Sequence, residues 1–135
     1  YRLIDKFLKA MPKLSKFRER TMMEAEESNM IKGLDGRYFH IKSSHSAVNT
    51  LLQGAGAIIC KEWLYHITNY IEDKGLNAKA VANIHDEVQF EVHKLDAEEF
   101  CTVSKQAMKD TEESLSVRCP LDSEAKVGLN WSETH

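Results

Sequence analysis

One segment of nine residues, Ile84–Val92, constrains the fold more than any other part of the sequence. Its apolar residues Val88, Phe90 and Val92 alternate with polar ones, which is the period of a strand with one buried face. The short apolar run Ala80–Ile84 before the turn predicts the partner strand. The sequence therefore predicts an antiparallel hairpin that carries a histidine and two acids at its tip.

The tip residues are His85, Asp86 and Glu87. Because a turn relaxes the alternation of side chains along a strand, both carboxylates can approach one cation. Mg²⁺ prefers oxygen ligands and takes one or two carboxylates, while substrate phosphates and water supply the rest. In nucleotidyl transfer, two such ions activate the attacking oxygen and neutralise the leaving one. The tip predicts a metal site for phosphoryl chemistry, although such clusters are more often solvated loops.

Length and composition set the frame for that site. The 135 residues suffice for one domain, and 18 Lys and Arg against 21 Asp and Glu give a net charge of −3. This balance excludes a uniformly basic protein that binds nucleic acid by charge alone. Three cysteines without metal-type spacing favour a reduced intracellular setting. No membrane span or signal peptide is evident, and a first residue other than Met indicates a piece of a longer protein.

The first 41 residues predict two helices and a ribbon. Residues 2–29 follow a helical pattern, which Pro12 divides by opening the second helix, where its missing amide costs nothing. Residues 31–41 contain Asp35-Gly36, a strong signal for a hairpin with a type I′ turn. We expect a small ribbon there.

A long helix follows, which we expect to begin at Ser43 or Ser44 and to end near Gly75. Its apolar stripe is Val48, Leu51, Leu52, Ala55, Ile58, Ile59 and Trp63. A second, polar stripe consists of His45, Asn49 and Gln53, with Gly56 beside it to allow close approach of another backbone. A bare polar stripe is more often a solvated face, so the residues alone leave its role open.

The last third predicts one helix and one strand after the hairpin. Asp96 and Glu99 have the spacing of a capping box. The buried side of the helix that they open is predicted to be Phe100, Val103, Ala107 and Met108. Residues 120–127 predict a further strand. The expected fold class is α+β, with long helices packed on a small antiparallel sheet that contains the hairpin.

Taken together, four segments resemble the C-terminal part of the family A DNA polymerases, the class of bacterial DNA polymerase I and of small-phage replicases. Residues 34–37 are similar to the family's LDGR ribbon, and residues 49–57 to its N-x-x-x-Q-[GS] helix. Residues 84–94 are similar to motif C of the palm, and residues 128–131 with His135 to the closing segment. The four segments occur in the family's order, so the likeness covers essentially the whole chain.

The resemblance implies a role for each matching residue of the hairpin. Asp86 would bind catalytic Mg²⁺, Glu87 would help to place the metal and the primer terminus, and His85 would contact the primer strand. The metal site would also need an aspartate from outside this chain. With the whole chain taken as a polymerase-domain fragment, residues 1–75 would be mainly helical with the ribbon near 31–41. Residues 76–135 would hold the palm hairpin, a helix and a C-terminal strand.

The resemblance also implies partners. Gln53 and Asn49 would reach the minor groove of the primer–template DNA, where acceptors on every base pair permit a check of shape. His45 stands where bacterial members often carry arginine, and Lys61 would lie near the DNA. The other implied partners are a dNTP and the missing N-terminal part of the polymerase, with no membrane, in the cytoplasm of a bacterial cell or phage-infected host.

Departures from the family pattern limit the expected activity. The upstream motif with the second aspartate and the Lys/Arg-rich fingers helix that grips the triphosphate do not occur in these 135 residues. We therefore expect that the chain alone does not polymerise. One alternative is a non-catalytic DNA-binding remnant or subunit. Another is an unrelated metal-dependent phosphohydrolase that recruits histidines such as His40, His66 and His93.

Overall fold

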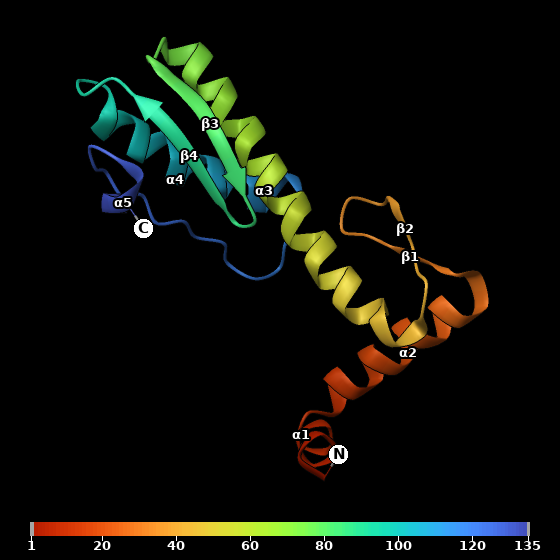
Figure 1. Ribbon diagram of the computed structural model, residues 1–135. Coiled ribbons are helices and arrows are strands. Elements are labelled where there is room, and N and C mark those ends of the chain that lie inside the picture. Colours follow the sequence, from red (N-terminus) through yellow and green to blue (C-terminus); the bar gives the residue numbers. More distant parts are fainter. Residues whose placement is uncertain (1, 135) are drawn as a thin grey trace. The chain divides into compact units, whose positions relative to one another are not determined.

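The computed structural model describes residues 2–134, with only the backbone of Arg2 (Figure 1). Contacts divide the chain into two compact units, the first ending at Ala55 and the second beginning at Gly56. The elements run in the order α1 (Arg2–Ala10), α2 (Pro12–Ser28), β1 (Met30–Lys32), β2 (Tyr38–His40), η1 (Ser44–Ser46), α3 (Ala47–Lys74), β3 (Ala78–Ile84), β4 (Glu87–Val92), α4 (Ala97–Ser114) and α5 (Trp131–Thr134). Helices combined with small antiparallel sheets confirm the α+β class.

Pro12 separates the first two helices, as the sequence predicts. Met11 has φ −126° and ψ 70°, outside the helical region, and Pro12 is the first residue of α2. At the other end of α2, Asn29 takes a left-handed φ of 55° and its N–H donates to the Ala25 carbonyl at 3.1 Å. This left-handed cap turns the chain directly into β1.

The β1–β2 ribbon is confirmed, but its turn differs from the prediction. Ile31 pairs with Phe39, and the Gly33 N–H donates to the Arg37 carbonyl at 2.7 Å. Of the two turn residues, only Gly36 has a positive φ, of 88°. A type I′ turn needs two such residues, so the pair lies instead in a three-residue loop that ends in a left-handed glycine.

The core of the first unit lies where α2, the ribbon and the start of α3 meet. Its buried residues are Ala25, Ile31, Ile41 and Ala47, with Phe39 and Leu51 packed against them. A Cβ on Gly54 would lie 2.5 Å from Cζ of Phe39, so the ring occupies the space that a side chain would fill. The glycine in the N-x-x-x-Q-G segment therefore has a packing role.

The ends of α3 were predicted with different success. Neither Ser43 nor Ser44 caps the helix with its side chain; instead the Ser46 N–H and hydroxyl both donate to the Ser43 carbonyl, at 2.9 and 2.7 Å, in the short 3₁₀ turn η1. Gly75 has the expected left-handed φ, 64°.

The predicted apolar stripe of α3 is exposed at one position. Leu52 is 61% exposed, whereas Ala47 and Leu51 pack in the core of the first unit.

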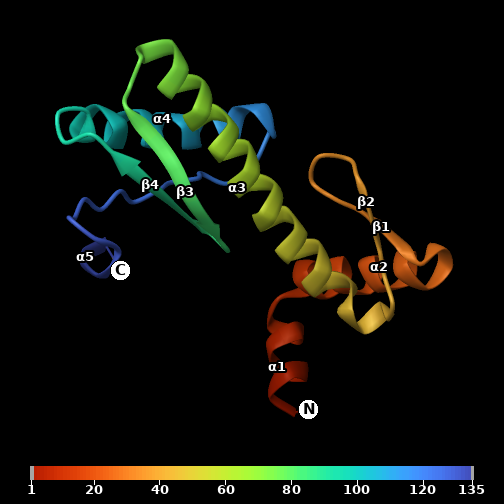
Figure 2. The ribbon, with the colours of Figure 1, turned by 45° about the horizontal axis from the view of Figure 1, so that its top comes forward.

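In the second unit, β3 and β4 form an antiparallel hairpin in which Ile84 pairs with Glu87 across the turn. The register shifts between Ala80 and Ala82, so Val81 is a bulged residue and is exposed. One face of the hairpin packs on α4 and on the second half of α3 (Figure 2). The cluster contains Trp63, Ile67, Ala107 and Met108, with Val88, Phe90 and Phe100 among the residues packed against it.

The helix α4 forms with the predicted buried side, but the capping box does not. Asp96 makes no side-chain cap. Its carboxylate accepts the N–H of Asn77 at 3.0 Å, while Glu99 accepts from the Lys74 ammonium at 2.7 Å. Both acids thus connect the start of α4 to the end of α3 and the segment after it. They bind these donors instead of the free backbone amides at the start of α4.

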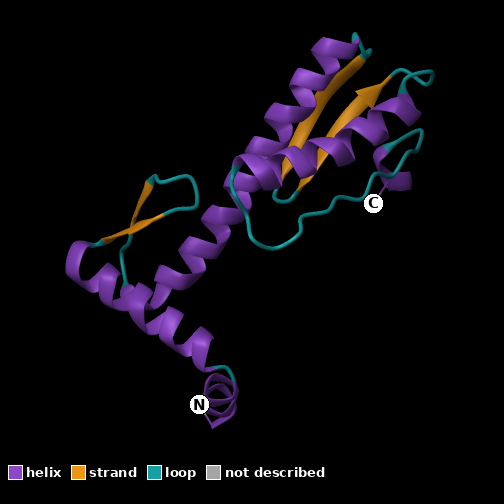
Figure 3. Ribbon diagram, turned by 180° about the vertical axis from the view of Figure 1, so that it is seen from behind, coloured by secondary structure: helices purple, strands orange, loops and turns teal. Residues whose placement is uncertain are grey.

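The strand predicted over residues 120–127 is wrong: the structure has no strand there (Figure 3). Side chains of α4 take up its backbone groups instead. The Leu121 N–H donates to Glu112 at 2.7 Å, and the Lys109 ammonium donates to the Leu121 carbonyl. Among the described residues, no helix is both long and apolar enough to cross a membrane.

Candidate functional site

The turn between β3 and β4 consists of His85 and Asp86, with Glu87 as the first residue of β4. His85 has φ 58°, a left-handed value that few residues other than glycine adopt. Such a conformation costs free energy and persists where the surrounding structure fixes it. Asn29 and Ser116, the other described non-glycine residues with a positive φ, follow helix ends, whereas His85 lies among the residues that the sequence singles out for chemistry.

Asp86 is an exposed carboxylate without a partner. Within residues 2–134 it accepts no hydrogen bond and joins no ion pair. Its charge nonetheless reaches the buried thiol of Cys60 on α3: burial raises the pKa of Cys60, and the nearby Asp86 carboxylate raises it further. Asp86 thus lies beside α3 with both of its oxygens open to a ligand from solvent.

Glu87 differs from its neighbour. It is half-buried, and Nε2 of Gln89 donates a hydrogen bond to its carboxylate. Residues two apart on a strand share a face, so Gln89 is placed to hold Glu87. The two acids therefore differ in their surroundings: the Asp86 carboxylate is open to solvent, and the Glu87 carboxylate is held by Gln89.

Both acids open into a groove of about 870 Å³ within the second unit. Its apolar floor includes Trp63, Phe90 and Phe100. Its other wall is the C-terminal segment, from Asp122 to Leu129. The groove was not predicted, because the segment that forms its wall was expected to be a further strand.

The chemistry of the turn fits a divalent cation, but incompletely. Oxygen ligands suit Mg²⁺, which commonly takes only one or two carboxylates from the protein. Among the described residues, no group of three His, Cys, Asp or Glu side chains is arranged to hold a metal ion. The turn therefore offers two carboxylates for a cation, and the remaining ligands would come from groups outside the turn.

The polar residues predicted to contact DNA form a separate group in the first unit. His45, Asn49 and Gln53 are all exposed, and none of their side chains hydrogen-bonds to another described residue. His45 lies in η1, so the four-residue helical spacing applies to Asn49 and Gln53 alone. Nothing approaches Gly56 within 4 Å of the position of a Cβ. Lys61, in the second unit, is exposed and unpaired among the described residues.

The three histidines considered as extra metal ligands do not gather at the turn. His66 lies 3.6 Å from Glu62 on the same helix, and Nδ1 of His93 accepts the Leu95 N–H at 3.4 Å. His40 is the last residue of β2, in the first unit. Sequence reasoning missed Gln89 and Cys60; the two-residue spacing of Gln89 from Glu87 was a signal that could have identified the first.

Comparison with known proteins places the chain in a family. The model of DNA polymerase family A matches residues 1–133. The chain is 37% identical to the DNA-directed DNA polymerase of Enterobacteria phage T3 and 34% identical to that of Escherichia phage T7, in each case over 98% of this chain and 22% of the relative. It is 29% identical to DNA polymerase I of Pseudomonas aeruginosa, over 98% of this chain and 15% of that protein.

A solved structure shares the fold. The POL domain of Pol1 from M. smegmatis, in complex with DNA primer-template and dNTP, matches 80% of this chain and 21% of that chain, with a TM-score of 0.73 at 18% identity. The chain spans about a fifth of the length of the phage relatives. The resemblance drawn from four short segments is confirmed, and this chain belongs to DNA polymerase family A.

Proposed function

We propose that this chain is the C-terminal fragment of a DNA-directed DNA polymerase domain, which transfers nucleotides to a primer 3′ end under the direction of a template. The observation that carries the proposal is Asp86, an exposed acid without a partner at a strained turn, in a chain whose family model matches residues 1–133. An unpaired acid held at a fixed turn is what a cation-dependent transfer requires.

Each residue of the turn has its own part in this proposal. Asp86 supplies a ligand oxygen to Mg²⁺, which, when bound, neutralises the charge that develops on the phosphate. Glu87, held by Gln89, would help to place the metal and the primer terminus without being indispensable. His85, exposed at the apex, contacts the primer strand.

The exposed amides of the first unit supply the DNA contact. Asn49 and Gln53 each carry donors and acceptors that no described residue uses. Acceptors in the minor groove are common to every base pair, so such amides read shape without reading sequence. His45 and Lys61 are the further DNA contacts in this proposal. The solved structure that shares the fold contains primer–template DNA and dNTP, which supports these partners.

The remainder of the polymerase is the essential partner. Two acids at the turn do not complete a two-metal site, so an aspartate from outside these residues supplies the rest. The chain alone is then inactive, and the joined protein acts in the cytoplasm of a bacterial or phage-infected cell. The relatives are more than four times as long as the matched segment, which agrees with a missing part.

Complementation tests this function. The purified chain is mixed with the polymerase segment that normally precedes it, and primer extension on a defined template is measured. We expect no synthesis from the chain alone, synthesis from the mixture, and none from a mixture that contains Asp86→Asn. Synthesis by the mixture with Asp86→Asn would contradict the role of Asp86.

Two further measurements, of DNA binding and of phosphate release, separate the alternatives. A non-catalytic DNA-binding subunit would bind primer–template in the mixture without extending it. A phosphohydrolase would release phosphate from a simple ester in Mg²⁺ without the missing segment. The second alternative lacks support among residues 2–134, since no third ligand lies near the turn.

A further inference from the structure

The positive charge of this chain is concentrated at its start. Seven of the 18 Lys and Arg residues occur within residues 2–20, against only two of the 21 acids. The chain as a whole is acidic, with a net charge of −3. The first two helices therefore form a strongly positive region that the proposed roles of the hairpin and of α3 do not use.

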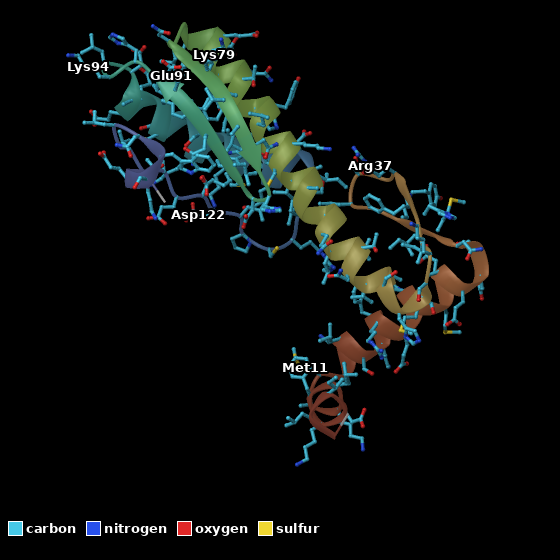
Figure 4. The ribbon with its side chains drawn as sticks, viewed as in Figure 1. Met11, Arg37, Lys79, Glu91, Lys94 and Asp122 are labelled. Atoms are coloured by element: carbon cyan, nitrogen blue, oxygen red, sulfur yellow. The ribbon has the colours of Figure 1, made fainter. Side chains whose placement is uncertain are left out.

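Five of these cations repeat at helical spacing. They follow one another at intervals of three or four residues, which places neighbours on one face of each helix: Lys6, Lys9, Lys13, Lys16 and Arg20. We call this set the cationic row. All five are exposed. The row bends once, at Met11, where α1 ends and Pro12 opens α2 (Figure 4).

Apolar side chains occupy the other side of the helices. By helical spacing, Ile4 and Phe7 of α1 lie away from Lys9, whereas Leu3, three residues before Lys6, borders the row. On α2 the buried residues, Thr21 and Ala25, lie away from the row. The row is thus a charged face that is distinct from the buried side of α2 and adjoins an apolar residue of α1.

None of the five cations is neutralised within the described residues. No acid lies within ion-pair distance of any of them. Of the two acids next to the row in sequence, Asp5 and Glu19, Glu19 accepts instead the hydroxyl of Ser15 at 3.0 Å. Like charges three or four residues apart on a helix repel each other. The row therefore costs stability unless an anion lies against it.

We propose that the cationic row binds the phosphate backbone of DNA and does so independently of sequence. Neighbouring cations within each helix are separated by about 4.5–6 Å along its axis, from a rise of ~1.5 Å per residue. A DNA strand carries one charge per ~3.4 Å of axis, so each cation of the row has phosphates within its reach. The proposal rests on the proposed function, because it takes the polymerase's DNA as the anion.

The composition of the row favours DNA over an acidic protein. The core of a protein–protein interface is depleted in Lys and enriched in aromatic and apolar residues. Four of the five residues of the row are lysines, and none of the five is aromatic or apolar. Flexible ammonium groups on a bare helical face suit phosphates that are contacted as point charges.

Salt dependence of DNA binding tests the proposal. In the full-length polymerase that carries this segment, Lys9→Gln, Lys13→Gln and Lys16→Gln are combined. Gln and Lys have similar helix propensity, so the helices are retained. The matched control combines Lys42→Gln, Lys79→Gln and Lys105→Gln, three exposed lysines outside the row that form no ion pair with another described residue. The dissociation constant for a primer–template is measured by fluorescence anisotropy from about 50 to about 200 mM KCl.

In the row variant, we expect the slope of log affinity against log salt concentration to become shallower by roughly 2–3, because each lost phosphate contact changes the slope by ~0.9. We also expect the affinity at low salt to fall about tenfold or more. The control should keep the wild-type slope. An unchanged slope overturns the proposal and leaves an acidic protein as the occupant. An equal change in the control overturns it as well, since the effect is then one of net charge.

The proposed function fails by a different observation. Binding isotherms require no catalysis, so they test the row whether or not Asp86 is catalytic. Normal primer extension by the polymerase with Asp86→Asn would end the catalytic proposal and leave the salt slopes interpretable.

Discussion

The two hairpins of this protein each carry an aspartate at the turn, and the two aspartates differ in whether the structure pairs them with a cation. In the β1–β2 ribbon, Asp35 accepts from Nε and Nη2 of Arg37 at 2.7 and 2.6 Å and from its backbone N–H at 3.2 Å. In the β3–β4 hairpin, Asp86 has no such partner among the described residues. A paired acid closes its own loop, whereas an unpaired one is available to bind a ligand.

The glycines show a related contrast. The ribbon's turn places Gly36 in the left-handed region, where glycine is strain-free. The hairpin's turn places His85 there instead. A loop selected only for closure would use glycine at such a position. The histidine indicates that the second turn is selected for what its side chains do.

The largest effect should distinguish the two aspartates. In the full-length polymerase, Asp86→Asn keeps the shape of the side chain but removes its charge, and we expect nucleotide incorporation to fall by ~10³-fold or more, about 4 kcal/mol of transition-state stabilisation. Asp35→Asn should leave incorporation near the wild-type rate. Single-turnover primer extension measures both. Equal losses would show that the contrast between the turns has no catalytic meaning.

Two glycines on α3 should respond in opposite directions. Gly54→Ala forces a Cβ against the Phe39 ring, and overpacking of this kind costs ~1–3 kcal/mol. Gly56→Ala enters open space inside a helix and should stabilise it by up to about 1 kcal/mol. Hydrogen exchange of the α3 amides measures the change in local stability in each variant. Similar exchange rates in both variants would mean that Phe39 moves aside freely.

A smaller effect should appear at the exposed amides. Gln53→Ala removes one shared contact to base pairs, and we expect about tenfold weaker primer–template binding or poorer extension past mismatches. Leu52→Ala, at the neighbouring exposed position, should change neither property, since Leu52 offers no polar group. Titration of labelled DNA compares the two. A greater loss in Leu52→Ala would move the interface to another face of α3.

The smallest effect concerns pH. The hydrogen bond and charge of Arg37 hold the pKa of Asp35 below its ordinary value of 3.8. A lowered pKa in the folded state stabilises the protein above the unfolded value and loses that contribution as pH falls through the folded value. Thermal unfolding of wild type and Asp35→Asn should therefore differ slightly at about pH 7, and the difference should shrink as pH falls below the ordinary value of 3.8. If the difference in unfolding temperature between the two proteins grew as the pH fell, it would contradict a lowered pKa of Asp35.

Short-range patterns predicted most of the elements correctly. Pro12, the alternation along β4 and the left-handed Gly75 each depend on only a few neighbouring residues. The errors came from competition between distant groups. Asp96 and Glu99 have capping-box spacing, but Asp96 accepts the Asn77 N–H and Glu99 accepts from Lys74 instead of capping the helix.

The candidate site shows the same division. The acids at the turn could be identified from three adjacent letters of sequence, because their chemistry is local. The hydrogen bond from Gln89 follows from strand periodicity, although it was not predicted. The groove, however, depends on α4 holding the backbone of residue 121 rather than leaving it to pair with β4. No local pattern encodes that choice.

Binding of Mn²⁺, a paramagnetic substitute for Mg²⁺, tests most directly whether the acid left open at the second turn holds a cation. In the full-length polymerase with primer–template bound, electron paramagnetic resonance measures Mn²⁺ affinity for wild type, Asp86→Asn and the control Glu91→Gln, an exposed acid on the same hairpin. We predict at least about tenfold weaker binding in Asp86→Asn, from loss of a charged ligand, and wild-type binding in the control. Identical affinity and stoichiometry in all three proteins would contradict the account.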